Sequence, residues 1–186
     1  MKKSFCISIL IFLVFLNYSA FTQSQNSFID SKLVVQSEDK DGKKFSAFMN
    51  NAVLTLNVTN GDFSVKADLS RLKTEDPKLD SVLNAQGNLF FIFKGNIDKN
   101  ILKYNQEQNT EKEFEMPGTL TIGDNSIETV ATYDPINLAE KSETKNYRMD
   151  FSVSVNPSKL SIKGLENKIT KLLLFEIQGG KLNIQN

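Results

Sequence analysis

Two stretches of the chain alternate strictly between apolar and polar residues, and this alternation limits the possible folds more than any other feature of the sequence. One stretch runs from Asp62 to Leu69, and the other runs from Tyr147 to Val155. Successive side chains of a β-strand point to opposite faces, so each stretch predicts a strand with one apolar face and one polar face. Strands that meet a core on one side and water on the other are typical of antiparallel sheets.

Further strand candidates follow along the chain, separated by turn residues. They cover residues 32–37, 52–58, 89–97, 101–106, 114–122, 126–133, 160–163 and 172–184. The pair Asn60-Gly61 stands between two alternating stretches and predicts a type I′ hairpin turn, which needs positive φ at both central residues. Gly179-Gly180 lies inside the last stretch and predicts a β-bulge. Short strands at this spacing predict an all-β barrel or sandwich.

One short helix is expected after residue 76. Asp76 can cap it and Pro77 suits its first position, while Leu79, Val82 and Leu83 share one face. The stretch 89–93 that follows is apolar on both faces, unlike the other strands. We therefore expect the helix to cover the outer face of that strand.

The N-terminus has the pattern of a signal peptide. Two lysines precede a mostly apolar stretch of 12 residues from Phe5 to Leu16, and small and polar residues follow. A membrane-spanning helix needs about 20 residues, so we expect removal of this segment rather than stable membrane insertion. Cleavage after Thr22 leaves residues 23–186 as the mature domain, and cleavage after Ala20 is a close alternative. The expected location is the periplasm or the cell exterior.

Residue chemistry excludes several classes of function. The chain has no His, and its single Cys6 lies in the expected signal peptide, so His-based catalysis, His-ligated zinc and disulfides are not expected. The 22 basic residues match the 22 acidic ones, which leaves no strong electrostatic attraction for nucleic acid. We expect no catalytic residue, no metal and no cofactor, and hence no enzyme.

The apolar faces of the predicted strands leave two interpretations open. The chain has 14 Phe and no Trp, which gives it large apolar side chains without polar groups. These side chains can form an ordinary packed core. An eight-stranded barrel is also wide enough to hold one ligand in its interior.

Three segments carry a resemblance to a known family. They are Phe63–Thr74, the strand Gly118-Thr119-Leu120-Thr121-Ile122, and Leu160–Ile162 together with Leu172–Ile177. In order and spacing they resemble the YceI-like family of secreted lipid- and polyisoprenoid-binding proteins. The resemblance implies a lipocalin-like, up-and-down antiparallel barrel of about eight strands, with one short helix and an isoprenoid or similar lipid tail inside.

With this fold, the first hypothesis is a secreted or periplasmic lipid-binding protein that holds a lipid tail in an apolar cavity. The alternative is a packed, non-catalytic β-domain that serves as a structural or interaction module of the cell envelope. In the first hypothesis the ligand-binding residues are inward-facing and apolar; those expected are Phe63, Val65, Phe91, Phe93, Met149, Phe151, Val153 and Phe175.

Overall fold

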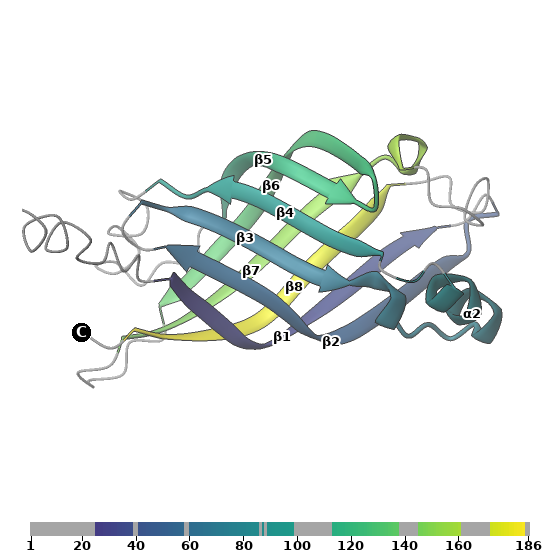
Figure 1. The fold of residues 1–186 in the computed structure, drawn as a ribbon, viewed down its shortest axis with the longest axis horizontal. Coiled ribbons are helices and arrows are strands. Elements are labelled where there is room, and N and C mark those ends of the chain that lie inside the picture. The colour runs from purple at the N-terminus through teal and green to yellow at the C-terminus, as the bar shows by residue number, and fades with distance from the viewer. Residues whose placement is uncertain are drawn as a thin grey trace, which may run out of the picture.

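The protein forms a closed barrel of eight antiparallel strands. The computed structural model describes residues 25–38, 41–57, 60–85, 87, 89–98, 113–137, 145–160 and 172–184. Each strand pairs with the next along the chain, and β8 pairs with β1 to close the barrel (Figure 1). The predicted all-β, up-and-down antiparallel barrel is thus confirmed.

The strands differ in length, and two short 3₁₀ helices and one α-helix connect some of them. The elements are β1 (Gln25–Glu38), β2 (Lys44–Asn57), β3 (Asp62–Asp68), η1 (Leu69–Arg71), α2 (Pro77–Ala85), β4 (Phe90–Asn96), β5 (Phe114–Ile122), β6 (Asn125–Asn137), β7 (Lys145–Val155), η2 (Pro157–Lys159) and β8 (Leu173–Ile184). The expected signal peptide and the strand candidates at residues 101–106 and 161–163 lie outside the described residues.

Strands β1 and β2 extend well beyond the stretches 32–37 and 52–58 that the sequence predicted. For β2 the reason is an irregularity at Asn51, an extra residue with a left-handed φ of 67°. Before it Ala47 and Met49 face the core, and after it Ala52 and Leu54 do. The inward positions therefore change parity at Asn51, and simple alternation detects only the part of β2 after it.

The hairpin at Asn60-Gly61 is present, but the predicted turn type is wrong. Of these two residues only Gly61 has a positive φ, at 82°, so a type I′ turn is not formed. The Gly61 N–H donates to the Asn57 carbonyl at 2.7 Å, which closes a wider turn. A Cβ at Gly61 would lie 2.1 Å from the Ile97 carbonyl oxygen, so this close approach also requires glycine.

The predicted bulge in the last strand is confirmed. Met149 of β7 pairs with Gly180, and Phe151 pairs with Ile177, so two residues of β8 face one residue of β7. The bulge lets the inward positions of β8 continue in register with β7 on both sides of it.

The predicted helix is α2, and Asp80 secures its start. The Asp80 carboxylate accepts hydrogen bonds from the Thr74 hydroxyl at 2.7 Å and the Thr74 backbone N–H at 2.8 Å. These hydrogen bonds stabilise the charged carboxylate and lower the pKa of Asp80.

The expected position of the helix is wrong. Helix α2 packs against η1 at one end of the barrel and does not cover the outer face of β4 (Figure 1). Its Leu83 is buried and belongs to the hydrophobic cluster of the core. On β4 the outward Phe90 ring is instead covered by Lys66, whose Nζ lies 4.5 Å from the ring centroid. A lysine stem can shield apolar surface while its charge stays in water, so the strand needs no helix over it.

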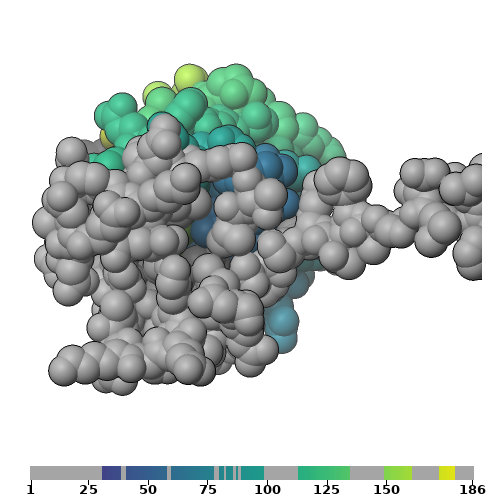
Figure 2. Space-filling view, turned by 90° about the vertical axis from the view of Figure 1, so that its left-hand side faces the viewer, coloured from purple at the N-terminus to yellow at the C-terminus, as the bar shows by residue number. Residues whose placement is uncertain are grey.

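We call the end of the barrel with α2 the α2 end, and the other end the opposite end. Strands β1, β3, β5 and β7 run toward the α2 end, while β2, β4, β6 and β8 run toward the opposite end. Figure 2 views the opposite end, where described residues of β5 and β6 (green) form the upper wall.

Candidate functional site

The inward-facing side chains of the barrel form the candidate site. They come from all eight strands and make one continuous hydrophobic cluster. All eight predicted ligand-binding residues belong to this cluster, and no more than 2% of the surface of any of them is exposed. The structure thus brings the predicted residues together, and their contact with a ligand stays a prediction.

Aromatic rings from non-adjacent strands meet across the interior. The Phe151 ring of β7 lies 5.5 Å from the Phe63 ring of β3 and 4.9 Å from the Phe93 ring of β4, measured between centroids. Nearer the α2 end, the rings of Phe91 and Phe175 are 4.8 Å apart. Since β7 and β8 are not neighbours of β3 and β4, these contacts span the interior from wall to wall. The middle of the barrel is therefore filled by phenyl rings.

The other three predicted residues line the walls around these rings. Val65 lies beside Phe93 in the register of β3 and β4, and Val153 lies beside Phe175 in that of β7 and β8. Met149 lies next to the bulge, opposite Gly180. Its flexible thioether suits an irregular place in a core.

Gly118 makes room for the Phe93 ring, a role that sequence reasoning did not recognise. A Cβ at Gly118 would lie 2.5 Å from Phe93 Cζ and 2.3 Å from the Lys94 carbonyl oxygen. Gly95, its partner in the register of β4 and β5, is similarly close to Met116, at 2.8 Å from the sulfur. The glycine that begins the segment Gly118–Ile122 is therefore explained by ring packing in the interior.

Tyr133 is an interior residue that the sequence analysis did not include. It is 2% exposed, belongs to the hydrophobic cluster, and packs its ring 5.7 Å from that of Phe114. Its hydroxyl is buried and has no hydrogen-bond partner among the residues that the structure describes. Burial, aided by the negative charge of Asp98, raises the pKa of Tyr133 to about 12. Alternation through Ala131 would have predicted its inward direction.

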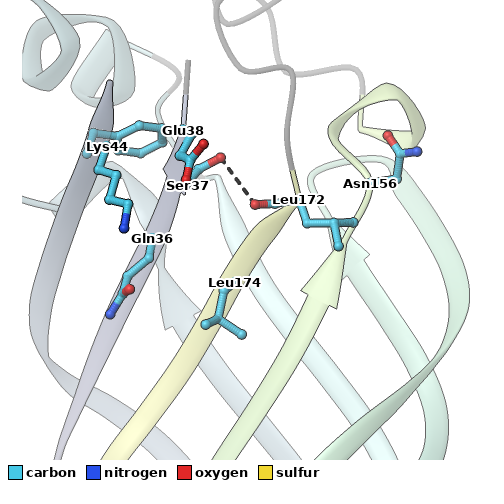
Figure 3. Close-up of a pocket in the computed structure, with 8 residues that line it drawn as sticks. Gln36, Ser37, Glu38, Lys44, Asn156, Leu172 and Leu174 are labelled. Atoms are coloured by element: carbon cyan, nitrogen blue, oxygen red, sulfur yellow. Dashed lines mark hydrogen bonds between the residues drawn. The ribbon is translucent and has the colours of Figure 1, made fainter. Parts of the chain in front are cut away.

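One open pocket of about 590 Å³ lies at the rim of the α2 end, where β1 ends and β8 begins (Figure 3). Its lining mixes polar and apolar side chains: Gln36, Ser37, Glu38, Lys44, Phe45, Asn156, Leu172 and Leu174. The Ser37 hydroxyl donates to the Leu172 carbonyl at 3.2 Å and ties the two strand ends together across the pocket (Figure 3). This pocket is open and partly polar, and is not an enclosed apolar cavity.

Two smaller pockets lie on the outer wall. One follows the outward residues Thr132, Ser152 and Glu176 across β6, β7 and β8, and the other lies over β2, β3 and β4. In the first, the hydroxyls of Thr132 and Ser152 are 2.6 Å apart and hydrogen-bonded. Polar side chains that satisfy one another in this way are typical of a solvated sheet face.

Within the described ranges, no group of three or more acidic, His or Cys side chains is arranged to hold a metal ion. The same residues include no helix that is long and apolar enough to cross a membrane.

Among solved structures, a binding domain has a fold similar to that of this barrel. It is similar to a polyisoprenoid-binding domain from Saccharophagus degradans, described as implicated in plant cell wall breakdown. The TM-score is 0.65 and the sequence identity 12%, and the match covers 88% of this chain and 99% of that one. No family model and no curated protein matches the sequence. The likeness shows a shared fold.

Proposed function

We propose that this protein binds an isoprenoid or other lipid tail inside its barrel and is a divergent member of the YceI-like family. The observation that carries the proposal is the continuous apolar interior of a closed barrel whose fold is that of a polyisoprenoid-binding domain. Among the described residues, the buried ones that carry a polar group are Ser31, Ser37, Asn57 and Tyr133, and all four side chains are uncharged. Such an interior suits a hydrocarbon chain.

Binding requires the phenyl rings that meet in the interior to move apart. Each ring contact contributes about 0.5–1.5 kcal/mol beyond its area, so opening the three contacts costs a few kcal/mol. Burying apolar chain stabilises by about 0.8 kcal/mol per CH₂, or about 16 kcal/mol for twenty carbons. That gain is large enough to offset ring opening and much of the association cost of about 4–15 kcal/mol. Long tails are therefore the favoured ligands.

We also propose that residues 1–22 are a signal peptide and that the mature domain acts in the periplasm or outside the cell. The support is the pattern of lysines, apolar stretch and small residues at the N-terminus. Expression of the full chain, fractionation of the cells and N-terminal sequencing of the product tests this proposal. A product that begins at Met1 in the cytoplasmic fraction contradicts it.

Introduced tryptophans test whether a tail enters the barrel. The natural chain has no Trp, so Phe151→Trp places a single reporter in the interior, and Ser154→Trp places one on the exposed face of the same strand. A prenyl alcohol with a spin label on its tail quenches Trp fluorescence at short range. We expect strong, saturable quenching of the interior reporter and little quenching of the exterior one.

Unlabelled prenyl alcohol serves as the competitor and should restore the fluorescence of the interior reporter. Equal quenching of both reporters would indicate binding to the outer surface. No quenching of either, with both variants folded by circular dichroism, would rule out the lipid-binding function.

The alternative function is a packed interaction module of the cell envelope, and the ring contacts across the interior favour it. A core that is already filled needs no ligand for its stability. The tryptophan experiment separates the two functions, because an interaction module takes up no tail.

A further inference from the structure

Tyr133 carries a buried hydroxyl in an otherwise apolar interior. Its Oη is buried from solvent, and no described residue forms a hydrogen bond with it. An unsatisfied buried donor destabilises the folded state, and native proteins contain few of them. An unsatisfied hydroxyl among the inward-facing side chains points to a ligand atom that satisfies it when a tail enters the barrel.

The position of Tyr133 is toward the opposite end of the barrel, beyond the phenyl rings at its middle. In the register of β6 it pairs with Phe114 on one side and with Phe151 on the other. Asp98 follows the end of β4 at this same end and is exposed. A tail that lies among the rings of Phe63, Phe93 and Phe151 therefore reaches Tyr133 as it leaves them toward the opposite end.

The charges near Tyr133 restrict what its partner can be. The phenol is protonated at physiological pH, as that of an ordinary tyrosine is, so it can donate a hydrogen bond. Burial raises the pKa of Tyr133, and the negative charge of Asp98 adds to the rise. Among the described buried residues there is no Lys or Arg to pair with an anion. These residues therefore offer no positive charge to a buried anionic group, whereas an uncharged oxygen needs none.

We propose, resting on the lipid-binding function above, that Tyr133 donates a hydrogen bond to an uncharged oxygen at the head of the bound tail. The barrel thereby selects prenyl chains that end in an alcohol, ketone or ether oxygen over prenyl phosphates.

Tyr133→Phe tests this proposal, because it removes the hydroxyl and keeps the ring. Thr132→Val is the matched control, since it removes a hydroxyl from the neighbouring outward position on the same strand. The affinities of geranylgeraniol, the hydrocarbon of the same skeleton and geranylgeranyl phosphate are measured by competition with a fluorescent prenyl alcohol. Each ligand is delivered from cyclodextrin to protein purified after expression of the full chain.

We expect the unsubstituted protein to bind the alcohol about three to ten times more tightly than the hydrocarbon, the value of one net hydrogen bond. Tyr133→Phe should abolish this advantage and leave hydrocarbon affinity unchanged, while Thr132→Val retains it. The phosphate should bind more weakly than the alcohol. Thermal unfolding should show Tyr133→Phe to be at least as stable as the unsubstituted protein without ligand, because it loses an unsatisfied donor.

Two results would overturn the inference and leave the lipid-binding function intact: an alcohol preference that persists in Tyr133→Phe, or a phosphate that binds more tightly than the alcohol. If the unsubstituted protein binds neither the alcohol nor the hydrocarbon, the lipid-binding function fails and the inference fails with it.

Discussion

At Gly118, one methyl group decides whether the barrel interior can form as it does. The missing side chain lets the Phe93 ring lie against β5, where a Cβ would be 2.5 Å from the ring and 2.3 Å from a backbone oxygen. Atoms at such distances must move, and the backbone oxygen can move only if β4 shifts. The ring cluster therefore depends on a residue that has no side chain of its own.

Gly118→Ala should destabilise the protein by about 1–3 kcal/mol, the usual cost of overpacking a core. Gly95→Ala is the comparison variant, because its Cβ would meet only side-chain atoms, of Met116 at 2.8 Å and of the Phe93 ring at 3.0 Å, and no backbone oxygen; it should cost less. Urea unfolding followed by circular dichroism measures both. Equal stability of the two variants would contradict the close approach of the β4 backbone to Gly118.

Tyr133 predicts a loss of stability at alkaline pH. Its pKa is about 12 in the folded protein against 10.0 for an ordinary tyrosine, so between these values the folded state binds the proton more tightly than the unfolded state. Stability should thus be unaffected below about pH 10 and fall as pH rises toward 12, by up to about 3 kcal/mol from this group. Urea unfolding at several pH values checks this, and Tyr133→Phe should show a smaller loss over the same interval.

Among the strands and turns, the hairpin between β2 and β3 depends on Gly61 for two reasons. Its φ is 82°, a conformation that favours glycine, and its Cα faces the Ile97 carbonyl oxygen. The Ile97 N–H also donates to the Gly61 carbonyl at 2.8 Å. This residue joins the β2–β3 hairpin to the end of β4.

Comparison of Gly61 with Gly42 separates the effect of the positive φ from that of the contact with Ile97. Gly42 has a φ of 79° but nothing within 4 Å of an added Cβ. Gly42→Ala should therefore cost about 1 kcal/mol from backbone strain alone. Gly61→Ala should cost clearly more, because Ile97 must also move. The difference in the free energy of unfolding between the two variants measures the contact, and a difference near zero would show that only the φ angle matters.

The sequence predicted elements best where alternation is regular. Strands β3 and β7 follow directly from it, and α2 follows from Pro77 and the spacing of its apolar residues. Alternation could not find the first half of β2, because the irregularity at Asn51 changes the parity of the inward residues. It also could not place α2, since a helix that packs on η1 and one that covers β4 require the same apolar face.

For the candidate site, the inward direction of the residues on β3 and β7 could be read from the sequence. Alternation does not determine the inward direction of Phe91 and Phe175, because their strands do not alternate, and the structure buries both. Contacts between rings on opposite walls depend on which strands face each other in the closed barrel. The role of Gly118 and the unsatisfied hydroxyl of Tyr133 depend on the same tertiary geometry.

In the whole molecule, pairing of β8 with β1 leaves the barrel without a free strand edge between its first and last strands. Closure removes the unpaired backbone groups that an open sheet would offer to other chains, and it encloses the apolar faces of all eight strands. In the lipid-binding function proposed above, a lipid tail would have to displace the phenyl rings that fill this interior.

The most direct test of the lipid-binding function is to ask what occupies that interior in the cell. The full chain is expressed in its native host, purified without detergent and analysed by native mass spectrometry, with organic extraction of the same sample. The account predicts one long-chain lipid per barrel, with an uncharged oxygen at its head, released on unfolding. Protein that carries no lipid by either method, and that also takes up no added prenyl alcohol, would contradict it.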